Sequence, residues 1–94
     1  MLKVTQAEYI SPKTLKVIFS NQEEYLVNLS DTINKEPRQI WQQLMDEAVF
    51  QAFEIDHDTV CWKNGLDVAP EYLYFLGNKD NPELQQQFKA WGYL

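Results

Sequence analysis

Residues 15–29 read LKVIFSNQEEYLVNL, and this stretch decides the fold. Apolar side chains recur at every second position in each of its halves, at Leu15, Val17 and Phe19 and again at Tyr25, Val27 and Leu29. A period of two residues indicates β-strands with one buried face. Asn21-Gln22 between the halves is suited to a tight turn, although glycine would suit it better than Gln22. The stretch therefore predicts an antiparallel hairpin.

The residues before this hairpin add a third strand. Residues 2–10 form an expected strand in which the alternation slips between Val4 and Ala7, as a β-bulge would cause. Ser11-Pro12-Lys13 is an expected turn, because proline fixes one backbone dihedral. Both connections are too short for a crossover, so the three strands are expected to form an antiparallel meander.

The middle of the chain shows a helical pattern. A polar connector, residues 30–36, leads to Pro37, which suits the first position of a helix. Asp46 is suited to cap a second short helix that ends near Phe53. One face of this helical region is apolar at the spacings i, i+3, i+4 and i+7, at Trp41, Leu44, Met45 and Ala48.

A second hairpin is expected next, because residues 53–55 and 59–62 flank the tripeptide Asp56-His57-Asp58. The turn dipeptide Asn64-Gly65 follows it. Pro70 then opens a short helix that extends through Leu76.

The last helix begins at Asn81-Pro82-Glu83, which offers a cap, a proline and an acid in the first turn. Its apolar face carries Leu84, Phe88 and Trp91. Strands followed by helices predict an α+β fold. It comprises an N-terminal three-stranded antiparallel meander, short helices, a second small hairpin and C-terminal helices. At 94 residues, residues 1–94 are expected to form one domain.

Charge and cysteine content restrict the partners. The formal net charge is −6, and the eight Lys and Arg residues are scattered without a basic stripe. We therefore expect no direct nucleic-acid binding, and an acidic surface that favours a basic protein partner or self-association. One cysteine, no secretion signal and no apolar run of about 20 residues predict a cytoplasmic protein that does not enter membranes.

The candidate chemistry is sparse. Asp56, His57, Asp58 and Cys61 are the nearest approach to a metal-ligand cluster, but neighbouring side chains of a strand point to opposite faces. His57 and Cys61 could be a base and a nucleophile, yet four residues of strand separate them by ~13 Å. We predict no catalytic residue, no cofactor and no metal, and hence no enzyme.

Residues 62–74, WKNGLDVAPEYLY, are the most distinctive segment. Trp62, Asn64, Gly65 and Pro70 form an expected structural motif: the end of a strand, a tight turn and a helix start. Asp67 would accept backbone N–H bonds at that start, and Glu71 would suit the helix dipole. The alternative is that Asp67, Glu71 and Tyr74 edge a recognition surface.

The last helix leaves a similar choice open. Phe88, Trp91 and Tyr93 near the C-terminus either close the core or form an apolar patch for a partner or a second copy. Exposed aromatic side chains are favoured anchors of interfaces. Phe88 and Trp91 therefore complete the candidate interaction surface with Asp67, Glu71 and Tyr74.

From about residue 2 to residue 76 the chain resembles an uncharacterised bacterial family, domain of unknown function 2442. The resemblance rests on the meander, the helical middle and above all residues 62–74. Family members carry a similar Trp-x-Asn-Gly-x-Asp-(aliphatic)-Ala-Pro-Glu-x-Leu-Tyr run. This chain departs at Asn21-Gln22, where the family often has an Asp-Gly-type turn, and in the helical extension over residues 77–94.

The resemblance implies a small α+β fold and no established activity. Some members are stand-alone short proteins, some precede a repressor-like helix-turn-helix domain, and some lie beside a second small gene in toxin–antitoxin-like arrangements. We expect a non-catalytic protein-interaction or regulatory module, of the kind that forms part of a toxin–antitoxin-like pair. The alternatives are a homodimeric structural or regulatory domain, and an enzyme that uses carboxylates near Asp67 and Glu71.

Overall fold

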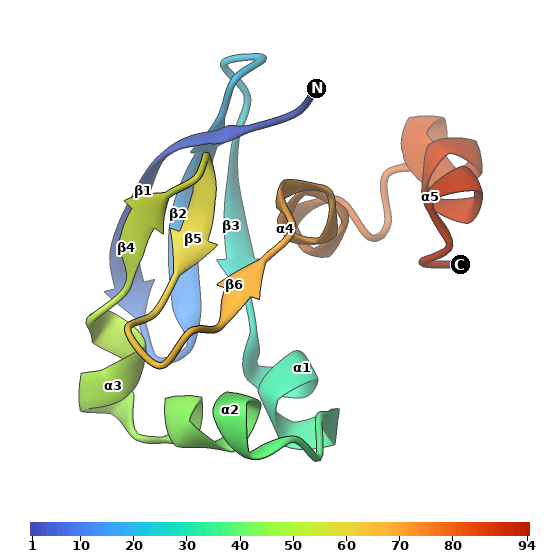
Figure 1. Cartoon of the computed structure of the whole chain (residues 1–94). Helices are drawn as coiled ribbons and strands as arrows, with labels where there is room; N and C mark the ends of the chain where they lie inside the picture. Colours follow the sequence, from blue (N-terminus) through green and yellow to red (C-terminus); the bar gives the residue numbers. More distant parts are fainter.

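A computed structural model describes all 94 residues and begins with the expected meander (Figure 1). The three strands are β1 (Val4–Ser11), β2 (Thr14–Phe19) and β3 (Glu24–Asn28), and they pair antiparallel in the order β1-β2-β3. The register of β1 against β2 shifts between Val4 and Gln6, where the alternation slips in the sequence. Leu15 and Val27 face each other and are fully buried, which confirms the alternating pattern.

A second sheet packs against the first and contains one strand more than the expected hairpin. Its strands are β4 (Glu54–Asp56), β5 (Thr59–Cys61) and β6 (Asp67–Val68), in the order β4-β5-β6. His57 and Asp58 form the turn between β4 and β5 with φ angles of 51° and 66°. The backbone N–H of Val4 donates to the carbonyl of Asp58 at 2.8 Å, which joins the edges of the two sheets.

Short helices connect the sheets. They are α1 (Ser30–Lys35), α2 (Gln39–Gln42), the 3₁₀ turn η1 (Gln43–Met45) and α3 (Glu47–Gln51). Asp46 caps α3 as predicted, since its carboxylate accepts a hydrogen bond from the backbone N–H of Ala48 at 3.0 Å. The expected connector before Pro37 is instead the helix α1, which is held by the burial of its single apolar residue, Ile33. Pro37 lies outside it, and α2 begins two residues later.

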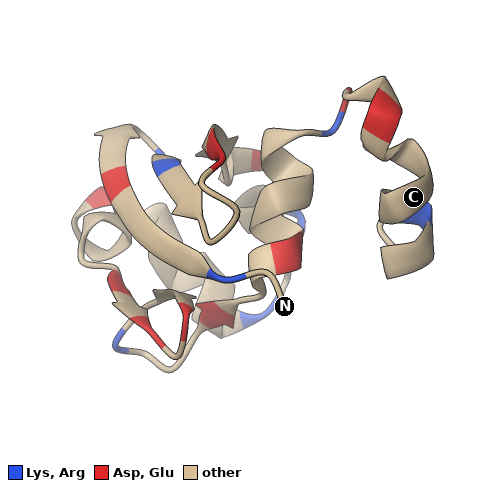
Figure 2. Cartoon of the chain, turned by 90° about the horizontal axis from the view of Figure 1, so that it is seen from above, with Lys and Arg blue, Asp and Glu red and all other residues tan.

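The C-terminal part forms an outer layer beside β3. It consists of α4 (Pro70–Gly77), the 3₁₀ turn η2 (Pro82–Leu84) and α5 (Gln85–Trp91). Figure 1 shows α4 next to β3 and α5 beyond α4, farthest from the sheets. Figure 2 shows α5 from above, carried on the loop that follows α4, with basic residues spread singly along the chain. None of the helices combines the length and the apolar character that a membrane span requires.

The core fills the space between the two sheets and continues under α4. Its fully buried side chains come from both sheets and from the helices, including Phe88 on the outermost helix α5. The largest of them are Phe19, Phe50, Phe88, Leu15, Leu29, Ile33, Leu44 and Leu73. The fold is therefore α+β, with the helical middle closing one end of the sheet pair and α4 closing one side (Figure 1).

Candidate functional site

The turn after β5 has the geometry that its sequence predicts. The backbone N–H of Gly65 donates to the carbonyl of Trp62 at 3.1 Å, and that of Trp62 donates to the carbonyl of Leu66 at 2.9 Å. The side-chain oxygen of Asn64 accepts from the N–H of Leu66 at 3.0 Å. Gly65 adopts a φ of 94°, a conformation that glycine reaches without steric cost.

Side chains of this turn fix it to the helical middle of the chain. The Asn64 amide donates to the carbonyl of Ile40 at 3.0 Å and to the side-chain oxygen of Gln43 at 2.7 Å. The indole N–H of Trp62 donates to the carbonyl of Phe50 at 2.9 Å, and the two rings lie 5.9 Å apart. These bonds connect residues far apart in the sequence: Asn64 holds the turn to α2 and η1, and Trp62 holds it to α3.

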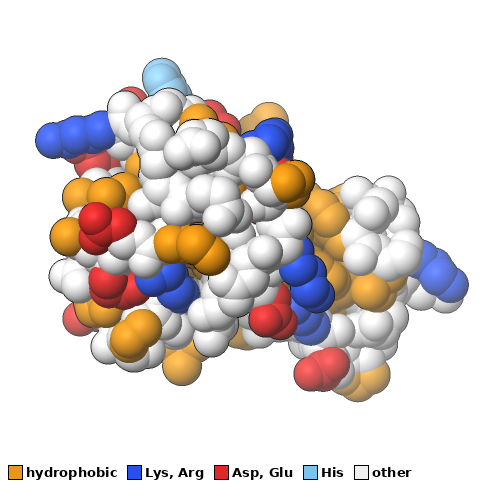
Figure 3. Space-filling model, turned by 90° about the horizontal axis from the view of Figure 1, so that it is seen from below, with side chains coloured by type: hydrophobic (Ala, Val, Ile, Leu, Met, Phe, Trp, Pro, Cys, Tyr) orange, Lys and Arg blue, Asp and Glu red, His pale blue; other side chains and the backbone are white.

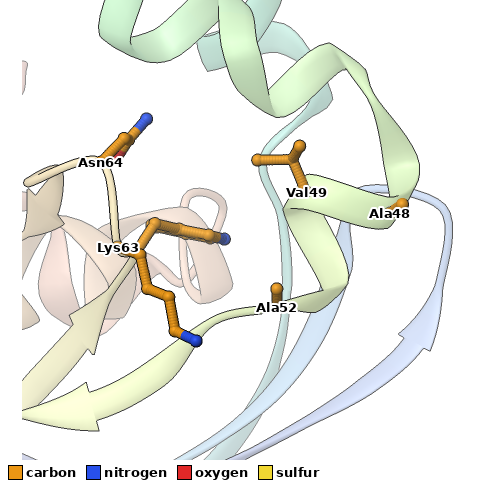
Figure 4. Close-up of a pocket in the computed structure, with 6 residues that line it drawn as sticks. Ala48, Val49, Ala52, Lys63 and Asn64 are labelled. Atoms are coloured by element: carbon orange, nitrogen blue, oxygen red, sulfur yellow. The ribbon is translucent and has the colours of Figure 1, made fainter.

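A cavity of about 270 Å³ lies between α3 and this turn. Figure 4 shows Ala48, Val49 and Ala52 on one side and Lys63 and Asn64 on the other. Trp62 completes the lining, and four of the six lining residues are apolar. Small side chains on α3 and at Ala52, which follows the helix, leave the space open, while the hydrogen bonds of Trp62 and Asn64 keep the opposite wall in place.

Lys63 is the only charged residue of this lining. Its side chain is exposed, and it forms none of the ion pairs of the structure. The ammonium group is therefore available to a charged ligand at the rim of the groove. We name this feature the α3–turn groove, defined by Ala48, Val49, Ala52, Trp62, Lys63 and Asn64.

Glu47 anchors the other side of α3 to the first sheet. Its carboxylate accepts hydrogen bonds from the Tyr9 hydroxyl at 2.8 Å and from the Lys13 backbone N–H at 3.1 Å. The Lys13 ammonium forms an ion pair with the same carboxylate. These donors hold the pKa of the Glu47 carboxyl below its usual value of 4.5, and the Lys13 side chain makes the largest contribution. They position α3, and thereby one wall of the groove.

Stability is expected to depend on pH through this carboxylate. A lowered carboxyl pKa in the folded state adds stability above the unfolded value of about 4.3, which is lost as the pH falls through the folded value. Glu47→Gln should therefore have a lower urea midpoint than wild type at pH 7, and the difference should shrink at pH 3. Glu54→Gln is the matched control, because no protein group donates a hydrogen bond to the Glu54 carboxylate. A pH-independent difference for Glu47→Gln would contradict the assignment.

The predicted role of Asp67 at the start of α4 is wrong. Asp67 lies in β6 opposite Cys61, and the cap position is Ala69, which makes no side-chain capping bond. Asp67 belongs to the strand because its neighbour Val68 is buried in the core. Pro70 occupies the first turn of α4 as expected, with Glu71 next to it. Asp67 is exposed and Glu71 half-buried.

The aromatic members of the predicted interaction surface are mostly covered. Phe88 is 0% exposed and Tyr74 8% exposed, whereas Trp91 is half-buried. The Tyr74 hydroxyl donates to Glu23 at 2.5 Å, and burial together with this carboxylate raises the pKa of Tyr74 well above its usual value. Phe88 packs against Phe75 at 5.1 Å. In Figure 3 hydrophobic side chains gather where the C-terminal helix meets the body of the molecule.

His57 and Cys61 do not form a joint site. His57 is at the exposed tip of the β4–β5 turn, and its side chain is 89% exposed. Burial, and then the carboxylates of Asp56, Glu54 and Asp67, raise the pKa of the Cys61 thiol, so it is a poor nucleophile. No three His, Cys, Asp or Glu side chains converge as metal ligands would.

The sequence pattern indicates Trp62 and Asn64 but not the α3 wall of the groove. The signal was the four-residue spacing of Ala48, on α3, and Ala52, the residue that follows the helix, with Phe50 buried on the other face. Small residues at i and i+4 on one helix face leave room for a neighbour. Only the fold shows that the 62–64 turn is that neighbour and that it does not fill the space.

Comparison with known proteins supports the family assignment and the fold. A family model described as "Protein of unknown function (DUF2442)" matches residues 4–78, and the chain belongs to this family. No curated protein matches. A crystal structure from Nitrosomonas europaea ATCC 19718, called a "Putative DNA Binding Protein", shares the fold with a TM-score of 0.75 at 19% sequence identity. The comparison covers 100% of this chain and 63% of that one.

This comparison overturns one prediction. The scattered cations and the net charge of −6 led us to exclude nucleic acid as a partner. The Nitrosomonas protein with the same fold carries the description "Putative DNA Binding Protein", so the exclusion does not stand. The physical reason is that whole-chain charge measures only the long-range field, which says little about one surface or about a longer chain that contains the same fold.

Proposed function

We propose that residues 1–94 form a single non-catalytic interaction or regulatory module, which docks a partner protein in the α3–turn groove. The observation that supports this is the groove itself, an apolar cavity of about 270 Å³ on the surface. Specific contacts concentrate in such places, where a rigid pocket receives a partner's apolar side chain. A partner encoded beside this chain, as in toxin–antitoxin-like pairs, would suit such a module.

The walls of the groove support the proposal because they are pre-formed. Trp62 is held by the Phe50 carbonyl, Asn64 by Ile40 and Gln43, and α3 by the Glu47 anchor. A surface that is already ordered loses little conformational entropy on binding. The same region is the part of the chain on which the family resemblance chiefly rests.

The experiment compares three tagged baits in the native host: wild type, Ala48→Trp and Ala90→Trp. Ala48 lines the groove, whereas Ala90 is an exposed alanine on α5 and serves as the control for adding an indole. We expect wild type and Ala90→Trp to recover one partner protein in stoichiometric amount, and a cross-linker to join it to Lys63 of the bait. Ala48→Trp should not recover this protein. Recovery of the same proteins by all three baits would contradict the proposal.

A second candidate function, DNA binding, comes from the description of the Nitrosomonas structure. This chain spans 63% of that protein, so the description has to be tested on this chain directly. Fluorescence anisotropy with labelled duplex DNA at 50 mM and 200 mM salt is the measurement. Binding through phosphates would weaken steeply between these two salt concentrations. Unchanged anisotropy at both would remove DNA as a partner of this chain alone.

A further inference from the structure

We propose that the α3–turn groove binds a peptide segment that places one large apolar side chain in the cavity and a carboxylate beside Lys63. The proposal rests on the function proposed above and adds the chemistry of the partner.

The size of the groove fits a side chain better than a complete small molecule. Pockets that enclose small ligands usually have volumes of about 300–1,000 Å³. The α3–turn groove holds about 270 Å³ and is open to solvent along one side. Apolar groups dominate its lining, so a Leu, Phe or Trp side chain gains more there than a polar one.

The charge at the rim favours acidic residues next to the apolar side chain of the bound peptide. Lys63 is the single charged lining residue of the groove and has no ion-pair partner. Lys35, Lys79 and Lys89 are also unpaired, but none of them lines the groove. A cation beside an apolar cavity is complementary to an apolar residue next to Asp or Glu. The net charge of −6 opposes an acidic segment at long range. At physiological salt, however, exposed charges beyond about 8 Å are largely screened, and Lys63 acts in direct contact.

The polar groups of the groove leave the lysine as the only partner for a charged ligand. The Asn64 amide is already engaged by Ile40 and Gln43, and the Trp62 indole N–H by Phe50. The remaining lining side chains, Ala48, Val49 and Ala52, have no polar atoms. Orientation of a bound segment therefore depends on one ion pair at one end of an apolar site.

The test uses three acetylated, amidated peptides: GSEFEEGS, GSKFKKGS and GSEAEEGS. Each is titrated into ¹⁵N-labelled protein, and the Trp62 indole and the Ala48 and Val49 amides are followed by NMR. Wild type is compared with Lys63→Glu and with Lys89→Glu, an exposed lysine on α5 that also has no ion pair. Circular dichroism checks that the variants fold.

We expect GSEFEEGS to shift the groove signals with a dissociation constant on the order of 1 mM or tighter, and GSEAEEGS to shift them little. Lys63→Glu should weaken GSEFEEGS about two- to five-fold, the range of one exposed ion pair, and should reverse the preference toward GSKFKKGS. Lys89→Glu should change neither.

Three other results would overturn the proposal. Equal binding of both Phe peptides to wild type would remove the charge preference and leave the groove as a docking site. Preference of wild type for GSKFKKGS would indicate a basic partner instead. If no peptide shifts the groove signals, both the partner chemistry and the proposed docking site fail.

Discussion

Trp62→Ala should remove about 3–5 kcal/mol from the free energy of unfolding, the usual cost of truncating a buried aromatic residue. Trp62 is 4% exposed, contacts the Phe50 ring and donates to the Phe50 carbonyl. Domains of this kind have total stabilities of about 5–15 kcal/mol, so much of the variant could be unfolded at 37 °C. Urea denaturation followed by circular dichroism measures the loss. A cost below about 1 kcal/mol would show that α3 and the turn are held mainly by other contacts.

The hydrogen bond of Trp62 can be separated from its packing by a matched pair of variants. Trp41 is 6% exposed, and its buried indole N–H has no partner. Trp62→Phe leaves the Phe50 carbonyl without its donor, whereas Trp41→Phe breaks no hydrogen bond. An unsatisfied buried polar group costs about 1–3 kcal/mol, so Trp62→Phe should be the more destabilising by about that amount. Equal losses would mean that water replaces the indole.

The features that could be predicted from the sequence are those with local causes. The meander follows from alternation within residues 15–29 and short turns, and the cap at Asp46 from a side chain two residues from its partner. The turn at Asn64-Gly65 is likewise fixed by bonds within residues 62–66. In each case the same few residues provide both the pattern and the interaction.

The features that could not be predicted depend on partners distant in the chain. β6 has only two residues and exists because it pairs with β5. α1 has only one buried residue, Ile33, so its sequence shows no apolar face. The groove requires Asn64 to reach Ile40 and Gln43, more than twenty residues away. Likewise, Phe88 and Trp91 have the same spacing whether their helix closes the core or exposes its apolar face. Only the packing of their rings on α4 distinguishes the two arrangements.

Gly77→Ala should destabilise the protein by about 1–3 kcal/mol, the range for overpacking a tight contact. Gly77 ends α4 where the helix crosses β3, and a Cβ there would lie 2.7 Å from the Cβ of Tyr25. Tyr25 cannot easily move away, because its hydroxyl donates to Glu23 and its ring packs 5.6 Å from that of Tyr74. Helix propensity alone predicts a gain of about 1 kcal/mol for alanine over glycine, so the sign of the effect distinguishes the two explanations.

Gly65→Asn is the control for this substitution, because its cost has a different origin. A Cβ on Gly65 would meet nothing within 4 Å, and only the positive φ of 94° opposes a side chain, which Asn tolerates better than most residues. Gly65→Asn should therefore cost about 1 kcal/mol or less.

If Gly77→Ala must push α4 away from β3, its effect should also reach Tyr74 and the helix that packs on α4. Near-ultraviolet circular dichroism of the aromatic cluster should then change in Gly77→Ala and not in Gly65→Asn. A stabilised Gly77→Ala with unchanged aromatic signals would mean that α4 can slide on β3 without loss, and that the close approach at Gly77 does not hold α4 in place.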